Sequence, residues 1–404
     1  MKKLLKIIGV LLFVAILSIV LLSRVYGVGI RIHDGRYLGY SGTTSEWLLL
    51  QYQNIPVRQD GPYVFNGDDG RYALTIRGDG KTPSKTYRNN ITSEIEVTAD
   101  NDKGTQFVVP LRKNYPRSIL NIPNPKHMLV ISDLEGEFDA LVNILQVNGV
   151  IDDSLNWHYG SGHLVLIGDM VDRGINVVPS LWLIYKLEAE AQSAGGDIHY
   201  VLGNHERYLL DGRVKSVAKK YFGSFRATGL SQKELWSENS ELGRWLRSKP
   251  ALLKIGKTLF AHGGISAKIL NLNPTLEKVD TEVAKGFTIE NSTQRTIENS
   301  LLHDSLGILF YRGLAQDMSK YNLGKKAGDE HVELILSRFG VDRIAIGHSL
   351  AEHVSYDYGG KVIRVDVNHA EEKSEALLFE GGLLWRVDNK GNKFPLEQVK
   401  NYND

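Results

Sequence analysis

The sequence predicts an α/β protein with a sheet covered by helices on both faces, and two features after residue 126 lead to that prediction. Short apolar runs with few polar interruptions recur there, among them "HMLVISD", "HLVLIGD", "KTLFAHGG" and "RIAIGHS". Between several of them lie segments with helical spacing, such as "EFDALVNILQVNG" and "VPSLWLIYKLEAEAQ". Continuous apolar strands that alternate with helices are typical of a sheet buried on both sides.

Length and composition limit the possible classes of protein. The chain has 404 residues, a length that favours two domains, and its 42% hydrophobic and 24% charged content is ordinary for a globular protein. The net charge of +1 gives no reason to expect a nucleic-acid partner. The chain has no cysteine, which excludes disulfides, thiolate metal sites and cysteine nucleophiles. Asp, Glu, Asn and His remain as potential metal ligands.

Residues 1–27 are predicted to be a membrane anchor or a signal peptide. Lys2, Lys3 and Lys6 precede an uncharged apolar run over residues 7–23. A helix of that length spans roughly 25 Å, the short end for a bilayer crossing. We expect an uncleaved anchor, with a cleaved signal as the alternative. In both cases the lysines stay inside, so the rest of the chain lies outside the cytoplasm, in a periplasm-type compartment.

Residues 28–125 are expected to form a small β-rich segment. "YALTIRG" and "SEIEVTA" alternate apolar and polar residues, and "NGDDGRY" and "RGDGKTP" have the composition of turns. "NIPNPKH", with two prolines, predicts a linker to the main domain, residues 126–388. Within that domain the polar helical stretches 231–248 and 275–301 are expected to be insertions over the active face. Residues 389–404 are expected to be a peripheral tail.

Polar residues able to bind metal follow five of the predicted strands, each near a glycine-containing turn. Ligands of open α/β sheets bind just beyond the carboxyl ends of the strands, so we expect these side chains to share one crevice. In chain order they are Asp133, Glu135, Asp169, Asn204, His262 and His348. Six oxygen and imidazole ligands without sulfur suit two adjacent divalent ions, with Asp169 as the bridge. Arg173, four residues after Asp169, can hold a phosphate bidentately.

The motifs "GDMVDRG" and "GNHE", preceded by an Asp motif and followed by "AHGG" and "GHS", resemble those of the calcineurin-like metallophosphoesterases. Within that family they resemble the phosphoprotein phosphatase branch and its bacterial relatives, over residues 126–370. The resemblance implies a β-sandwich flanked by helices and two divalent ions, Mn²⁺ first and Fe, Zn²⁺ or Mg²⁺ as alternatives. It assigns Asp133, Glu135 and Asp169 to one ion. It assigns Asp169, Asn204, His262 and His348 to the other.

The resemblance also implies the catalytic roles. His205 resembles the general acid that protonates the leaving alkoxide, and Asp172 resembles its carboxylate partner. Arg173 resembles one phosphate clamp, and "GILFYRGL" resembles the segment that supplies a second, which makes Arg312 the candidate. The implied reaction is in-line attack of metal-bound hydroxide on a phosphate monoester, without a phosphoenzyme.

The implied substrate is a protein phosphorylated on Ser, Thr or Tyr, or a small phosphoester. Diadenosine tetraphosphate is an alternative, made less plausible by the expected location outside the cytoplasm. A rival from another class is a binding protein with a degenerate phosphatase fold.

Glu135 departs from the family pattern, which has His at this position. In the favoured interpretation Glu135 is a ligand whose negative charge favours Mn²⁺ or Mg²⁺ over Zn²⁺. In the second, Glu135 lies behind the ligands and only one ion binds firmly. In the third, the site is inactive. The first is favoured because the other ligand types, both arginines and His205 are present.

Single residues also have ordinary structural interpretations. Asp133 and Asn204, each taken alone, would be helix N-caps, and Arg312 alone would be a surface arginine. His369 follows a strand end and could line the pocket, whereas the remaining histidines outside the motifs are expected to be structural. The prediction therefore depends on the combined pattern.

Overall fold

The structure, a computed structural model, describes residues 55–288 and 305–399 apart from Pro83 and Glu372, and the short stretches 12–14, 17–18, 28–31, 37–41 and 46–48. The predicted membrane segment lies largely outside the described residues, as do residues 289–301 of the second predicted insertion. No helix within the described ranges combines the length and the apolar character that a bilayer crossing requires.

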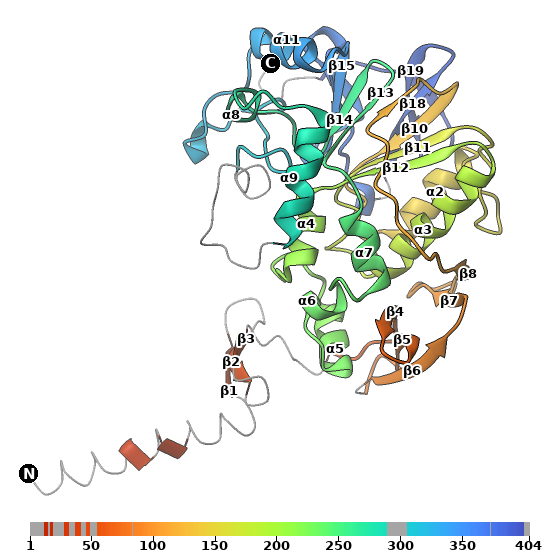
Figure 1. Cartoon of the computed structure of the whole chain (residues 1–404), viewed down its shortest axis with the longest axis vertical. Coiled ribbons are helices and arrows are strands. Elements are labelled where there is room, and N and C mark those ends of the chain that lie inside the picture. Colours follow the sequence, from red (N-terminus) through yellow and green to blue (C-terminus); the bar gives the residue numbers. More distant parts are fainter. Residues whose placement is uncertain are drawn as a thin grey trace, which may run out of the picture.

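Two six-stranded sheets form the centre of the molecule (Figure 1). The first has the order β12-β11-β10-β18-β19-β20, and the second has the order β16-β17-β15-β14-β13-β9. The bounds of the first are β10 His127–Ile131, β11 His163–Ile167, β12 Asp197–Val201, β18 Glu375–Glu380, β19 Leu383–Asp388 and β20 Lys393–Pro395. Those of the second are β9 Asn121–Ile122, β13 Leu252–Ile255, β14 Thr258–Ala261, β15 Arg343–Ile346, β16 Ser355–Asp357 and β17 Val362–Arg364. Strands β10, β11 and β12 are parallel, and so are β14, β15 and β17.

The two sheets pack face to face, with helices on their outer sides. Val130 and Val165 of the first sheet share one buried cluster with Phe260 and Ala345 of the second. Leu129, the neighbour of Val130, belongs to a different cluster on the outer face of its sheet. Successive residues of a strand point to opposite faces, so burial on both sides explains the uninterrupted apolar runs. The predicted α/β fold and the sandwich flanked by helices are confirmed.

The helices form two groups, one for each sheet. The outer cluster of the first sheet includes α2 (Phe138–Val147) and α3 (Val177–Ser193). The outer cluster of the second includes α8 (Ala267–Leu270), α9 (Leu276–Thr288) and α11 (Asp329–Phe339). The same first cluster also includes α4 (Asn204–Asp211), α5 (Lys219–Thr228), α6 (Gln232–Leu235) and α7 (Glu241–Arg247). The described residues also form the 3₁₀ turns η2 (Ser319–Tyr321), η3 (Tyr358–Gly360) and η4 (His369–Glu371).

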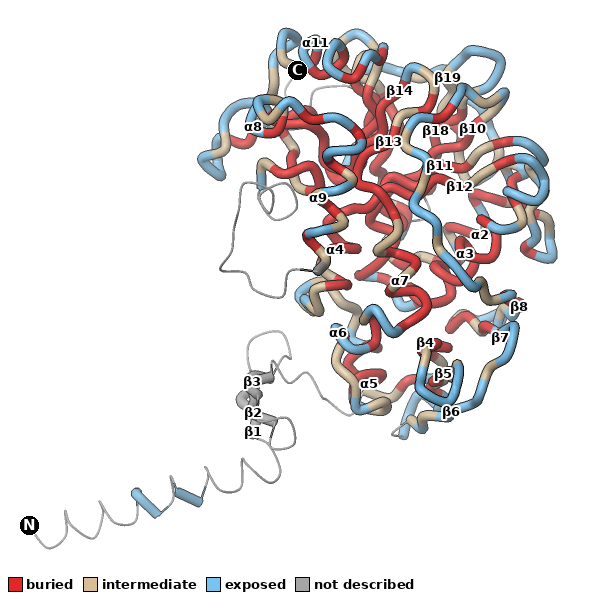
Figure 2. Tube along the Cα trace, in the orientation of Figure 1, coloured by how far each residue is buried: buried red, intermediate tan, exposed pale blue. Residues whose placement is uncertain are grey.

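The predicted β-rich segment covers the far side of α3. It contains β4 (Gln59–Gly67), β5 (Gly70–Arg77), β6 (Lys85–Ile91), β7 (Glu94–Thr98) and β8 (Gln106–Pro110), preceded by β1 (Val28–Arg31), β2 (Tyr37–Ser41) and β3 (Glu46–Leu48). Trp182 of α3 donates a hydrogen bond to the carbonyl of Pro62 at 2.9 Å. Helix α3 is therefore buried nearly all round (Figure 2), which explains its lack of a polar face.

Three peripheral predictions need correction. Asn121 and Ile122 of the predicted linker form β9, which pairs with β13. Residues 231–248 are helical as predicted, but Trp236 and Trp245 are buried in the core, so this stretch is no polar surface insertion. Residues 393–395 of the predicted tail form β20 at the edge of the first sheet.

Two histidines join β11 and β12: half-buried His163 at the start of β11 and buried His199 in the middle of β12. Nε2 of His199 lies 2.9 Å from Nδ1 of His163. Burial, followed by the charge of His163, lowers the pKa of His199 to about 3. The unfolded chain, with an ordinary histidine pKa of about 6.5, binds more protons than the folded chain between these two values. The contribution of His199 to stability is therefore present above the unfolded pKa and is lost as the pH falls.

We predict that replacing His199 with Gln flattens the acid side of the stability profile. Between pH 7 and pH 5 the wild-type chain should lose about 2 kcal/mol more free energy of unfolding than H199Q. Urea unfolding at the two pH values measures the difference. Replacement of the exposed His158 with Gln is the matched control. Equal losses in wild type and H199Q would show that His199 is not kept neutral by the fold.

Candidate active site

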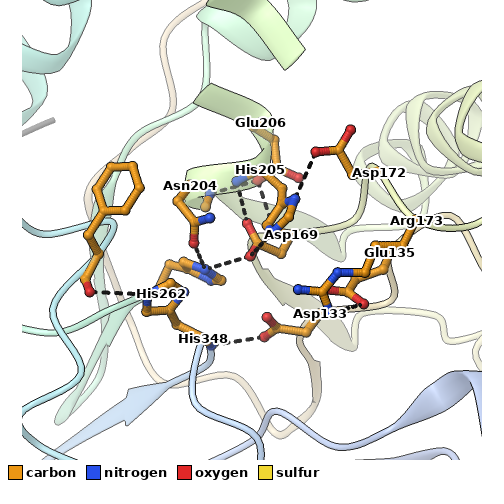
Figure 3. Close-up of polar contacts among 12 residues, drawn as sticks. Asp133, Glu135, Asp169, Asp172, Arg173, Asn204, His205, Glu206, His262 and His348 are labelled. Atoms are coloured by element: carbon orange, nitrogen blue, oxygen red, sulfur yellow. Dashed lines mark hydrogen bonds and ion pairs between the residues drawn. The ribbon is translucent and has the colours of Figure 1, made fainter. Parts of the chain in front are cut away.

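Loops from both sheets bring the predicted ligand residues to one place (Figure 3). Asp133 and Asp169 follow β10 and β11, and Asn204 follows β12. His262 and His348 follow β14 and β15 of the other sheet. The backbone N–H of His348 donates to Oδ2 of Asp133 at 3.0 Å, and Nε2 of His262 lies 3.0 Å from Oδ2 of Asp169. The predicted convergence of the strand ends is confirmed.

Backbone hydrogen bonds hold the turns after β10 and β11 side by side. The N–H of Asp133 donates to the carbonyl of Gly168 at 3.0 Å, and that of Glu135 donates to the carbonyl of Asp169 at 2.9 Å. The N–H of Gly136 donates to the carbonyl of Met170 at 2.9 Å. Glu135 and Asp169 are therefore fixed as neighbours by the backbone.

Six of the predicted site residues have a left-handed backbone conformation. Their φ angles are 54° for Asp133, 50° for Glu135, 55° for Asp169, 72° for Asp172, 51° for Arg173 and 62° for His348. This conformation costs an L-residue about 1–2 kcal/mol. The surrounding hydrogen bonds must supply that energy, so the site is held in shape before any ligand arrives.

Two glycines leave room for the carboxylates. A Cβ on Gly203 would lie 2.1 Å from Oδ1 of Asp169. A Cβ on Gly347 would lie 2.0 Å from Oγ of Ser132 and 2.5 Å from Oδ2 of Asp133. Since real side chains cannot approach so closely, these glycines of "GNHE" and "GHS" are required by the packing of the site.

His262 presents a nitrogen to a cluster of acceptor atoms. Its Nδ1 lies 2.6 Å from the carbonyl oxygen of Ile167, to which it donates. Its Nε2 then faces Oδ2 of Asp169 at 3.0 Å and Oδ1 of Asn204 at 3.1 Å. A nitrogen fixed in this way by a carbonyl behind it is the usual arrangement of a metal-binding histidine. His348 is oriented similarly, because its Nε2 lies 3.1 Å from the carbonyl of Phe310.

Two sets of side chains offer ligand atoms within 4.8 Å of one another, and Asp169 belongs to both. One set is Asp169, His262 and His348, and the other is Glu135, Asp169 and His205. Carboxylate and imidazole ligands around a shared carboxylate fit a pair of divalent ions. Glu135 lies among these ligand atoms, whereas Asp133 is in neither set and lies beside them.

The charges of the site favour a cation. Burial, and then the charge of Asp169, raises the pKa of Asp133 to about 6 against the opposing effect of His262. Burial, and then the charges of Asp133 and Asp169, raises the pKa of Glu135 to about 7, although Arg173 opposes the change. Carboxylates that repel one another in this way are stabilised by a multivalent cation between them.

His205 forms a pair with Asp172. Its Nδ1 lies 2.8 Å from Oδ2 of Asp172, and its Nε2 lies 3.8 Å from Oδ2 of Asp169. Burial disfavours the charged ring, but the carboxylates of Asp169 and Asp172 outweigh it and raise the pKa of His205 to about 9. The ring is thus held by Asp172 with its other nitrogen turned toward the ligand residues.

Both predicted arginines contact ligand residues. Nη1 of Arg173 lies 2.6 Å from Oε1 and 2.7 Å from Oε2 of Glu135, and its side chain is 60% exposed. Nη1 of Arg312 donates to the carbonyl oxygen of His348. One guanidinium therefore contacts Glu135, and the other contacts the backbone of His348.

Three more residues also belong to the site, and of these only His369 was expected to line the pocket. Glu206 is fully buried and accepts hydrogen bonds from the backbone of Asp169, Met170 and Gly203 and from the hydroxyl of Tyr200, all at 2.7–2.8 Å. Asp366 follows β17 and is buried beside the ligand residues. His369 is buried, with Nε2 2.9 Å from the carbonyl of Ser132, so it supports the backbone before Asp133. Glu206 is the last residue of the motif "GNHE", and this motif was the feature of the sequence that could have predicted its role.

We predict that replacing Glu206 with Gln destabilises the fold by about 2–4 kcal/mol, because an amide cannot accept the hydrogen bonds that both carboxylate oxygens accept. Urea unfolding in the presence of a chelator measures the effect without contribution from metal. Replacement of Glu234, which accepts from Ser231 at the exposed start of α6, with Gln should cost less than about 1 kcal/mol. Equal losses in the two variants would contradict the role of Glu206.

Comparisons with known proteins give consistent results. A family model described as calcineurin-like phosphoesterase matches residues 126–352. Shewanella-like protein phosphatase 2 of Arabidopsis thaliana is 28% identical over 212 residues, which are 49% of this chain and 49% of that protein. The chain thus spans about half the length of this relative.

Two further matches are informative. The symmetrical bis(5'-nucleosyl)-tetraphosphatase of Neisseria gonorrhoeae is 28% identical over 135 residues, covering 33% of this chain and 42% of that protein. Among solved structures, a cold-active protein-tyrosine phosphatase of a psychrophilic Shewanella species superimposes with a TM-score of 0.75 and 29% identity. That match covers 84% of this chain and 99% of the other.

Proposed function

Since the chain belongs to the calcineurin-like phosphoesterase family, we propose that it is a metal-dependent phosphatase that hydrolyses phosphate monoesters in phosphorylated proteins. One observation carries the proposal: two ligand sets meet at Asp169, with the His205–Asp172 pair and two arginines beside them. The relatives named as protein phosphatases support a protein substrate.

We assign the ligand residues to two ions as follows. Asp169, Asn204, His262 and His348 would hold one ion, and Asp133, Glu135 and Asp169 would hold the other. Bound divalent ions would withdraw charge from the phosphoryl oxygens and lower the pKa of coordinated water. Glu135 in place of His makes the second set rich in carboxylate oxygen, which supports Mn²⁺ or Mg²⁺ as its ion.

The protein groups then bind the phosphate and protonate the leaving group. Both oxygens of Glu135 contact Nη1 of Arg173, and no described contact engages Nη2 or Nε. Those N–H groups can donate to phosphoryl oxygens, as can Arg312 on the other side. His205, held at Nδ1 by Asp172, would donate the proton on Nε2 to the leaving oxygen.

The proposed location rests on the N-terminal sequence. Lys2, Lys3 and Lys6 before the apolar run support an anchor with the phosphatase domain outside the cytoplasm. This location supports an extracytoplasmic phosphoprotein over a cytosolic dinucleotide as substrate.

We predict that the chelator-treated chain hydrolyses p-nitrophenyl phosphate only after Mn²⁺ is added. Asp169→Asn should lower kcat/KM by at least about 100-fold, because the negative charge common to both ligand sets is lost. His205→Ala should lower kcat by about 10²–10⁴-fold on a phosphoserine peptide and by less on p-nitrophenyl phosphate, whose leaving group needs little protonation. Steady-state kinetics measure both effects, with the exposed Asp139→Asn as control.

Other outcomes would identify a different function. An inactive chain that still binds phosphopeptides would indicate a binding protein with a phosphatase fold. Faster hydrolysis of bis(p-nitrophenyl) phosphate or of diadenosine tetraphosphate than of any monoester would replace phosphatase activity with phosphodiesterase or dinucleotide hydrolase activity.

Aromatic rings beside the site support phosphotyrosine as a substrate. Tyr208 packs edge-on against His205 with 5.5 Å between ring centroids, and its ring lies 5.7 Å from that of Phe310. Phe310 in turn lies 6.4 Å from His348. Tyr208 and Phe310 are half-buried, and the guanidinium of Arg213 lies over the Tyr208 ring, 5.3 Å from its centroid. We propose that the exposed part of these rings contacts an aromatic leaving group.

We predict that Tyr208→Ala raises KM for a phosphotyrosine peptide by about 3–10-fold and leaves KM for the matching phosphoserine peptide nearly unchanged. Stacking on the ring is lost only for the aromatic substrate. Kinetics on the two peptides measure this, and the exposed Tyr321→Ala is the control. Equal changes for both peptides would mean that Tyr208 does not select the substrate.

A further inference from the structure

The second sheet brings one more carboxylate to the edge where its histidines lie. Strands β14, β15 and β17 are consecutive and parallel, and Ala261, Ile346 and Arg364 are partners in register. His348 comes two residues after Ile346, and Asp366 comes two residues after Arg364. The N–H of Val365 donates to the carbonyl of Ile346 at 2.9 Å, so the pairing continues past the end of β17. Asp366 therefore lies two residues beyond the end of β17, just as His348 lies two residues beyond the end of the neighbouring strand β15.

Asp366 is a buried residue, and within the described part of the chain its side chain has no hydrogen-bond or ion-pair partner. The residue is 6% exposed, and its backbone carbonyl accepts from the N–H of Ala351 at 2.9 Å. Among the described residues no hydrogen bond or ion pair engages its carboxylate oxygens. Such a group costs several kcal/mol unless a positive charge faces it.

The groups whose charges act on Asp366 are the ligand residues. Burial, and then the charges of Asp133 and Glu135, raises the pKa of Asp366 well above its usual range. Asp169 acts in the same direction, and His262 opposes the change. Arg364 is also near, but its Nη2 donates to the carbonyls of Ser349 at 3.2 Å and Leu350 at 2.9 Å. The strand register thus places Asp366 beside His348, and Nη2 of Arg364 is engaged by backbone carbonyls.

We propose that Asp366 is a further ligand of the metal centre, on the side of Asp133 and Glu135. This inference rests on the proposed function. The centre then has four carboxylates, which balance the charge of two divalent cations. One side contains Asp133, Glu135 and Asp366, and the other contains two imidazoles and an amide. Oxygen-rich sites select hard ions, so the side with Asp366 should take Mn²⁺ or Mg²⁺ in preference to Zn²⁺.

The test is calorimetric titration of the chelator-treated full chain with Mn²⁺ and, separately, Zn²⁺. Wild type should bind two Mn²⁺ ions. Asp366→Asn should weaken one of the two Mn²⁺ affinities by about 10–100-fold, while Zn²⁺ binding on the imidazole side stays the same. Asp357→Asn is the matched control, because this carboxylate lies in the same sheet but pairs with Lys326. It should leave both affinities unchanged.

Thermal unfolding separates a ligand from a merely structural residue. Without metal, D366N should be at least as stable as wild type, because a neutral amide needs no positive charge beside it. With Mn²⁺ its gain in Tm should be smaller than that of wild type. A structural role would instead lower Tm equally in both conditions.

Three results would overturn the inference. The first is that wild type and D366N both bind two Mn²⁺ ions with the same affinities. This result would leave the proposed function intact. The second is a D366N chain that is unfolded without metal, because a structural role then suffices. The third is a wild type that binds no divalent ion, which overturns the proposed function as well.

Discussion

The contact between Asp169 and His262 joins the two sheets at the site, and the other parts of the site are arranged around it. Asp169 follows β11 of the first sheet, His262 follows β14 of the second, and both are almost completely buried. Despite burial, the charges of His262 and His205 hold the pKa of Asp169 well below its usual range. Its Oδ1 also accepts from the N–H of His205 at 2.7 Å. A buried carboxylate is stable here because charged and hydrogen-bonding partners surround it.

The strain of the backbone follows from that arrangement. Neighbouring turns can direct their side chains into one small space only if the backbone changes direction sharply in each turn. The left-handed residues Asp133, Asp169 and His348 provide this reversal, and glycines before or after them provide the room. Glu206, in the first turn of α4, holds the turn after β11 by accepting from the N–H groups of Asp169 and Met170. It also accepts from the N–H of Gly203 and the hydroxyl of Tyr200. The packing of the core thus compensates for the backbone strain that holds the ligand atoms in place, as in other preorganised sites.

The sequence was sufficient where the relevant interactions are local, and insufficient where they are distant in the chain. Apolar runs that end in Asp, Asn or His beside glycine predicted the strands and six ligand residues that the structure brings together. Asp366 has no such turn after it, and its position follows only from the register between β15 and β17. The burial of α7 could not be predicted for a similar reason, since its partners include β4, more than 170 residues earlier in the chain. The two-residue strand β9 is too short to show a pattern.

Glu135 links the metal side of the site to the phosphate side. Its carboxylate belongs to a ligand set and also pairs with Arg173. Because the arginine is 60% exposed, this ion pair contributes no more than about 1 kcal/mol, so a doubly charged phosphate can compete for the guanidinium. A histidine at this position would leave the arginine without its anchor and would place a softer ligand beside the ion. In the proposed function the glutamate would therefore act in two ways at once: it would supply hard oxygen to a cation, and it would hold Arg173 beside the ligand residues, where a phosphate could reach it.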